Sequence, residues 1–202
     1  GLEHHSVLEP VEHLEQQGYH ITYLRVDAEG KVDPQDVKDA LSEQTMLVAI
    51  IHASNEIGTI QSIADIGELT RAYQVPLLVD ATQTLGHIPG NVDELNADLL
   101  SFSAHKFYGP KGVGALFIRE GVKVASLLLG GDQERSSRAS TQNVTGAIGM
   151  AHALKLCEQT MEKETKHQMT LRDKLINDIP KMIDGVKLNG HLKDRLANNA
   201  HF

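Results

Sequence analysis

Short apolar runs alternate with longer amphipathic stretches along this chain, and this alternation restricts the fold more than any other feature. The runs are short enough to be buried strands, whereas the stretches between them have the apolar spacing of helices. Strands and helices that alternate in this way predict an α/β fold, with a parallel or mixed sheet and helices on both faces. The predicted strands are YHITYLRV (19–26), MLVAIIHA (46–53), PLLVDA (76–81), DLLSFS (98–103) and GALFI (114–118).

The stretches between the strands carry helix signals of their own. Asp33 is predicted to cap a helix over residues 33–44, because an aspartate followed by proline is a common helix start. Cys157 is predicted to be a packed core thiol, because it lies on one helical stripe together with methionine and leucine residues. Further helices are predicted over residues 5–17, 63–73 and 144–182, the last with an apolar stripe of Ala147, Ile148, Ala151 and Leu154 and with Pro180 at its end.

Composition excludes several classes of protein. The chain has 202 residues, 41% of them hydrophobic, and a net charge of -8, which argues against nucleic acid or an anionic membrane as a partner. It contains no apolar run of membrane-spanning length and no secretion-signal pattern, so a cytoplasmic location is expected. A single cysteine excludes a disulfide framework, and the histidine spacing matches no metal motif, so no metal site is expected.

Polar side chains gather where three of the predicted strands end. The carboxyl ends of parallel strands share one edge of a sheet, and functional groups collect there. The sequence therefore predicts a site at this edge. Its candidate residues are Asn55 just after the first of these strands, Asp80 and Gln83 at and after the end of the second, and Ser103, His105 and Lys106 at and after the end of the third.

This set of groups suits pyridoxal phosphate. A lysine in a partly desolvated pocket can form a Schiff base with the aldehyde of that cofactor. The ring nitrogen needs a carboxylate to keep it protonated, and Asp80 can provide one. Ser103 and His105 could hold the phosphate, while Gln83 and Asn55 could reach the oxygen side of the ring.

Five strings carry a more specific resemblance: EHHSVL, HASNEIGTIQ, VDATQTLGHIP, DLLSFSAHKFYGPKGVGALF and GGDQERSSRAST. They resemble successive blocks of the cysteine desulfurase (NifS/IscS-like) family of class V aminotransferase-like, pyridoxal-phosphate enzymes. The resemblance implies a fold type I large domain with a mostly parallel seven-stranded sheet, a smaller domain and a homodimer. It makes Lys106 the Schiff-base lysine, with His4 stacked on the ring and Thr141 reaching the phosphate of the neighbouring subunit's cofactor.

The resemblance also implies a reaction and a domain plan. Members convert L-cysteine to L-alanine and pass the sulfur to an enzyme cysteine, for iron-sulfur cluster or other cofactor synthesis through an acceptor protein. The family's nucleophilic cysteine loop is not among these residues, so a central fragment without sulfur-releasing activity is expected. Its parts would be 1–143 (large domain), 144–182 (linking helix) and 183–202 (start of a small domain). Two alternatives stay open: a selenocysteine lyase or other class V enzyme, and a non-catalytic scaffold or dimerisation fragment.

Overall fold

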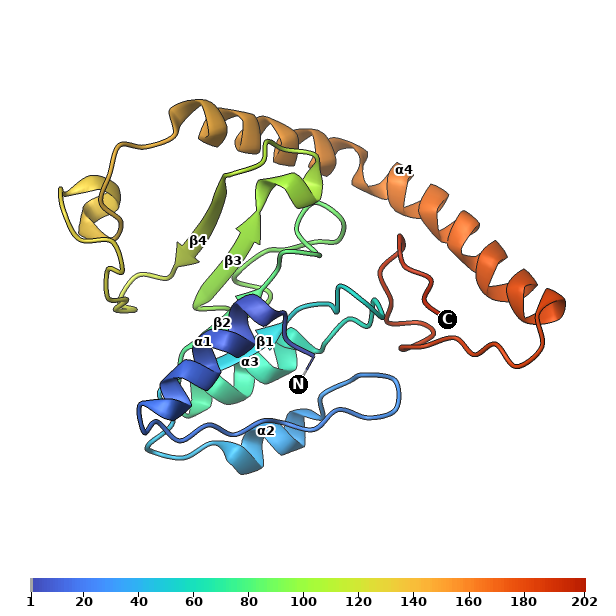
Figure 1. Cartoon of the computed structure of the whole chain (residues 1–202), viewed down its shortest axis with the longest axis horizontal. Helices are drawn as coiled ribbons and strands as arrows, with labels where there is room; N and C mark the ends of the chain where they lie inside the picture. Colours follow the sequence, from blue (N-terminus) through green and yellow to red (C-terminus); the bar gives the residue numbers. More distant parts are fainter. Residues whose placement is uncertain (1) are drawn as a thin grey trace.

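The computed structural model describes residues 2–202 and contains one four-stranded sheet in the order β1-β2-β3-β4 (Figure 1). Strand β1 (Val48–Ile51) is parallel to β2 (Leu77–Asp80), and β2 is parallel to β3 (Leu99–Ser103). Strand β4 (Gly114–Ile118) joins β3 antiparallel. The predicted α/β class with a mostly parallel sheet is confirmed. The described residues form four strands rather than seven, so this is a partial domain.

One helix begins where its capping signal predicts. The Asp33 carboxylate accepts a hydrogen bond from the backbone N–H of Gln35 at 2.8 Å, and Pro34 opens the helix. This helix ends at Ala40, earlier than predicted. The long helix covers the predicted residues, with Pro180 in its last turn. The helices are α1 (His5–Gln16), α2 (Pro34–Ala40), α3 (Ile63–Ala72), α4 (Val144–Met182) and the short 3-10 helices η1 (Ala104–Phe107) and η2 (Gln133–Ser136).

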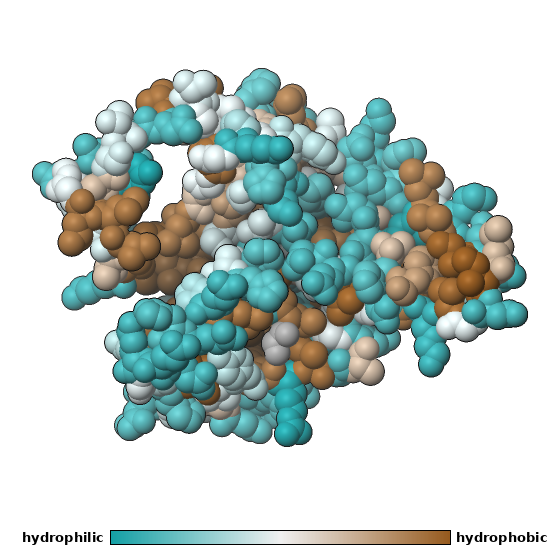
Figure 2. Space-filling model, in the orientation of Figure 1, coloured by the Kyte–Doolittle hydropathy of each residue, from teal (hydrophilic) through white to brown (hydrophobic). Residues whose placement is uncertain are grey.

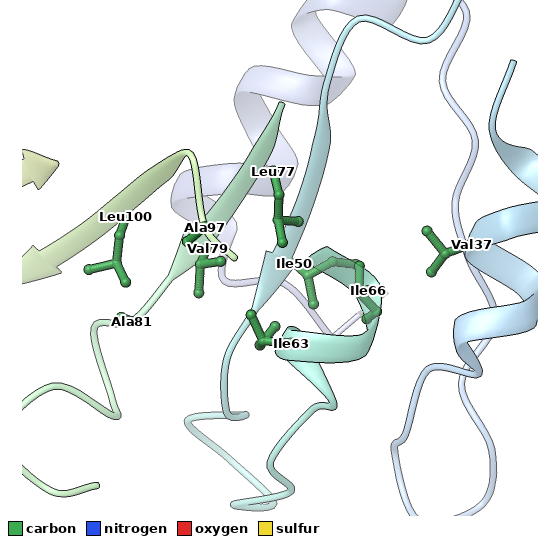
Figure 3. Close-up of a cluster of buried hydrophobic side chains, with 9 residues drawn as sticks. All are labelled: Val37, Ile50, Ile63, Ile66, Leu77, Val79, Ala81, Ala97 and Leu100. Atoms are coloured by element: carbon green, nitrogen blue, oxygen red, sulfur yellow. The ribbon is translucent and has the colours of Figure 1, made fainter. Parts of the chain in front are cut away.

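The main core lies between the sheet and α3 (Figure 3). Ile63 and Ile66 of α3 pack with Leu77 and Val79 of β2, and all four are fully buried. Burying a side chain of this size contributes roughly 1.5–3 kcal/mol each. Val37 of α2 extends the cluster, so α3 packs on the sheet and α2 packs on α3. This core fixes the strands whose ends carry the candidate site.

A second cluster joins α4 to η1. Phe107 is fully buried and packs with Ala153 and Cys157, and the Cys157 thiol lies 3.5 Å from the Phe107 carbonyl oxygen. The prediction of a packed core thiol is therefore confirmed. Of the stripe predicted at the front of α4, only Leu154 is partly buried, against this cluster; Ala147, Ile148 and Ala151 are exposed, Ile148 by 65%. The reason is that α4 meets η1 through its Ala153–Cys157 side and does not lie across the second face of the sheet.

One predicted strand is wrong. Residues 19–26 are not a strand, and from residue 20 onward their backbone makes no ladder hydrogen bonds. Their side chains still show the pattern that suggested a strand, because Leu24 packs on the core while Tyr19 and Tyr23 are about half exposed. A strand is defined by hydrogen bonds to a neighbour, and none of residues 2–202 forms one beside this segment.

The end of the chain packs back onto the domain. Residues 189–199 contact the loop at 54–60 that follows β1, and Leu196 and Ala197 are buried there. The division into 1–143, 144–182 and 183–202 stays a prediction. Within the described part of the chain, no helix combines the length and apolar character needed to cross a bilayer.

Candidate active site

The register of the sheet brings three strand ends to one edge. Ile51 at the end of β1 pairs with Asp80 at the end of β2, and Asp80 pairs with Ser101 near the end of β3. Because these strands are parallel, the segments that follow them start from the same edge. Of the residues predicted for the site, Asn55, Asp80, Gln83, Ser103, His105 and Lys106 all belong to this edge.

Asp80 is the most firmly held residue of the set. It is 7% exposed, and its Oδ1 accepts a hydrogen bond from the backbone N–H of Thr82 at 2.9 Å. Thr84 closes the same turn by donating its hydroxyl to the Ala81 carbonyl at 3.3 Å. Gln83 lies within this turn and is partly buried. The turn therefore holds a buried carboxylate and an amide in a defined place beside β3.

Lys106 lies in η1, directly after β3. Its backbone carbonyl accepts a hydrogen bond from His87 Nε2 at 3.0 Å, and the next residue, Phe107, is fully buried. Tyr108 then takes a left-handed conformation with φ 65°, which ends the helix. The backbone of Lys106 is thus anchored, but the residue is exposed, as is His105. The partly desolvated pocket expected around the lysine is not formed by the described residues.

Three of the candidates, Asn55 among them, lie in loops or at a helix end. Asn55 is exposed in the turn after β1. His4 caps α1, because its Nδ1 accepts from the backbone N–H of Ser6 at 3.1 Å; the Ser6 hydroxyl also lies 2.8 Å from this nitrogen. Thr141 is exposed just before α4, in a segment outside the strand edge. The roles of all eight candidates stay predictions.

Glu3 is a buried carboxyl that sequence reasoning missed. Its Oε1 accepts a hydrogen bond from the backbone N–H of Ile51 at 2.9 Å, while its Oε2 is buried without a partner. Burial raises the pKa of Glu3 to about 7; the Ile51 N–H opposes this and the charge of Asp80 adds to it. Next to two histidines near the chain start, Glu3 resembles part of a solvated segment. Glu3 is buried because its carboxyl group reaches the backbone N–H of Ile51 at the edge of β1 that no other strand of the described residues covers.

His52 is a second buried group that the prediction overlooked. It directly follows β1 and is 4% exposed, and burial lowers its pKa to about 4. Its Nδ1 lies 3.0 Å from the Thr84 hydroxyl. Because that hydroxyl donates to the Ala81 carbonyl, we assign the Nδ1 proton to His52 as the donor. His52 thus links the end of β1 to the turn that carries Gln83. A histidine directly after an apolar run was the available signal.

The fold and the candidate site define an α/β domain whose candidate functional groups lie at the carboxyl edge of parallel strands. Comparison with known proteins agrees. The family model described as aminotransferase class-V matches residues 1–202. The chain therefore belongs to the aminotransferase class-V family.

The curated relatives carry a more specific name than the family model does. A protein of Dictyoglomus turgidum named cysteine desulfurase IscS is 53% identical over 201 residues, which cover 100% of this chain and 51% of that protein. One of the same name from Clostridium botulinum is 47% identical over 203 residues, again 51% of its length. The chain thus spans about half the length of the curated relatives it matches.

Solved structures give the same result. A structure titled NifS-like protein has a TM-score of 0.94 and 38% identity, covering 98% of this chain and 55% of the other. The structure of DndA from Streptomyces lividans has a TM-score of 0.89 and 32% identity, covering 98% and 56%. The backbone described above is therefore that of the corresponding part of NifS-like proteins.

Proposed function

We propose that this chain is the cofactor-binding core of a pyridoxal-phosphate-dependent cysteine desulfurase. The observation that carries the proposal is the placement of Asp80 and Lys106 at the ends of two adjacent parallel strands. The likeness to proteins named cysteine desulfurase along the whole chain supports the choice of reaction. An amine, a carboxylate, a hydroxyl and an imidazole on one edge fit a group with an aldehyde, a basic ring nitrogen and a phosphate.

Each candidate residue then has one task. Bound pyridoxal phosphate supplies an aldehyde carbon and a ring that withdraws electrons. Lys106 would bond that aldehyde, and the buried carboxylate of Asp80 would hold a proton on the ring nitrogen. Ser103 and His105 would hold the phosphate. Of the other candidates, Asn55 and Gln83 would face the ring oxygen, His4 would stack on the ring, and Thr141 would serve the neighbouring subunit's cofactor.

L-Cysteine is the proposed substrate, with a sulfur-acceptor protein downstream in iron-sulfur cluster synthesis. Removing sulfur from cysteine requires an accessible thiolate as nucleophile. The one cysteine in the sequence, Cys157, is 8% exposed, and burial raises the pKa of its thiol. We therefore expect the chain, incubated with pyridoxal phosphate and cysteine, to form neither sulfide nor alanine. Sustained formation of both products would contradict this.

Covalent trapping tests the assignment of the lysine. The chain is mixed with pyridoxal phosphate, reduced with borohydride, digested and analysed by mass spectrometry. The label is expected on Lys106 and is expected to be lost in Lys106→Ala. The matched control is Lys111→Ala, because Lys111 is an exposed lysine five positions further along the chain. A label spread evenly over the surface lysines, or one that persists in Lys106→Ala, would refute the proposed function.

A homodimer is the proposed assembly. Leu127, Leu128 and Leu129 lie in the segment between β4 and η2, and they are 93%, 50% and 87% exposed. Figure 2 shows apolar side chains gathered on this projecting segment. Such an exposed apolar patch favours contact with another surface. Sedimentation equilibrium is expected to give a dimer for the wild type and a monomer for Leu127→Asp; a wild-type monomer at high concentration would exclude the assembly.

A further inference from the structure

The loop that presents Asn55 has a closed backbone. The Ser54 N–H donates to the Thr59 carbonyl at 3.0 Å, and the Gly58 N–H donates to the Ser54 carbonyl at 3.0 Å. The Ser54 hydroxyl also accepts from the backbone N–H of Glu56 at 3.3 Å. The position of Asn55 is therefore set by residues 54–60 as a unit, and whatever fixes this unit also fixes Asn55.

The C-terminal segment (residues 189–199) is bonded to this loop along its whole length. More than a hundred residues separate the two in sequence, so the contacts are tertiary. The Asn199 side-chain amide donates to the Glu56 carbonyl at 2.7 Å. Three further hydrogen bonds run from Leu196 N–H to the Gly58 carbonyl (3.0 Å), from Ile60 N–H to the Asp194 carbonyl (2.9 Å) and from His191 N–H to the Thr59 hydroxyl (2.9 Å).

The middle of this contact is excluded from water, whereas the hydrogen bond from Asn199 to Glu56 at its end is exposed. Thr59 is fully buried, and Arg195 and Leu196 are 4% and 3% exposed. A Cβ added at Gly58 would lie 2.5 Å from Cγ of Asn199, so the loop approaches the segment as only glycine allows. Buried hydrogen bonds are costly to break, because each released group is left without a partner. The contact is therefore a specific fit and not a chance apposition.

Arg172 ties the C-terminal segment to α4. Its side chain is 8% exposed, and its Nη1 donates to the carbonyls of Arg195 and Leu196 at 3.3 Å each. Its Nη2 pairs with Asp173 at 2.7 Å, which balances the buried charge. The segment is thus held between the loop on one side and the long helix on the other.

We propose that the C-terminal segment, anchored by Arg172, positions the loop that carries Asn55, and that Asn199 is its principal positioning residue. Asn199 reaches the backbone beside Asn55 and also accepts a hydrogen bond from Arg195 Nη1 at 2.7 Å. The link to cofactor binding rests on the proposed function, since it requires Asn55 to contact the cofactor. The link between the C-terminal segment and the loop does not depend on the proposed function.

Hydrogen exchange on the 202-residue chain tests the structural part. Asn199→Ala is expected to speed exchange at the amides of residues 58, 60 and 196 about fivefold, the effect of losing one net hydrogen bond. Asn199→Asp keeps the acceptor for Arg195 and replaces the amide donor by a carboxylate oxygen that cannot donate to the Glu56 carbonyl, so it serves if the alanine variant does not fold. Lys174→Met, an exposed change on the same helix as Arg172, is the control and leaves these amides unchanged. Unchanged exchange in a folded Asn199→Asp chain would overturn the proposal.

A double-mutant cycle tests the functional part, with pyridoxal phosphate as the probe. Asn199→Ala is expected to raise the Kd of the wild-type chain about fivefold, and to have no further effect once Asn55 is alanine. Equal effects in both backgrounds would show that Asn199 does not act through Asn55 and would refute the positioning role. If the wild-type chain binds no pyridoxal phosphate, the proposed function fails, and hydrogen exchange alone decides whether the segment orders the loop.

Discussion

Replacing Glu3 by glutamine is expected to change how the stability of this chain depends on pH. The folded-state pKa of Glu3 is about 7, against an ordinary value of 4.5. Between these values the folded chain holds a proton that the unfolded chain has lost, so the free energy of unfolding falls as pH rises. From about pH 5.5 to about pH 8, this group alone lowers the free energy of unfolding by about 2 kcal/mol.

His52 acts in the opposite direction. Its folded-state pKa is about 4, against an ordinary value of 6.5, so it is neutral when folded and protonated when unfolded between those values. The unfolded chain then binds more protons, and the free energy of unfolding rises with pH until it levels off above the ordinary value. From about pH 5.5 to about pH 8, the gain is about 1.4 kcal/mol. In the wild type the two effects nearly cancel.

Urea unfolding followed by circular dichroism at the two pH values separates the two groups. Between the lower and the higher pH, the Glu3→Gln chain is expected to gain about 1.4 kcal/mol, and the His52→Gln chain to lose about 2 kcal/mol. Glu9→Gln, an exposed change on α1, is the control and keeps the wild-type profile. A Glu3→Gln profile parallel to that of the wild type would refute the assignment of Glu3 as a buried, neutral acid.

Two further predictions concern close packing. Gly58→Ala and Gly112→Ala both place alanine at a positive φ, +72° and +77°, but only the first brings Cβ against a side chain, that of Asn199. Urea unfolding is expected to show a loss of about 1 kcal/mol for Gly112→Ala and about 1–3 kcal/mol more for Gly58→Ala, and equal losses would contradict the packing. The Cys157 thiol is expected to react with a disulfide reagent only as fast as the chain opens, and rapid reaction of the folded chain would show that it is not buried.

The strand ends were predictable because their signals are local. An apolar run such as PLLVDA shows both a buried strand and the carboxylate at its end, and parallel topology then brings neighbouring ends together. The segment 19–26 shows the limit of the same reasoning. Its apolar pattern is that of a strand, but forming one depends on a neighbour that no local signal can supply.

The groups that sequence reasoning missed depend on contacts between distant parts of the chain. Glu3 bonds a backbone N–H 48 positions away, and Asn199 bonds a carbonyl 143 positions away. Neither partner can be read from neighbouring residues, because each is a backbone group left free at the edge of a strand or loop. The residues proposed to do the chemistry are thus readable in the sequence, whereas their positions and protonation depend on folding. It follows that a variant can keep every proposed cofactor-binding residue and still lose the site, and Asn199→Ala tests this directly.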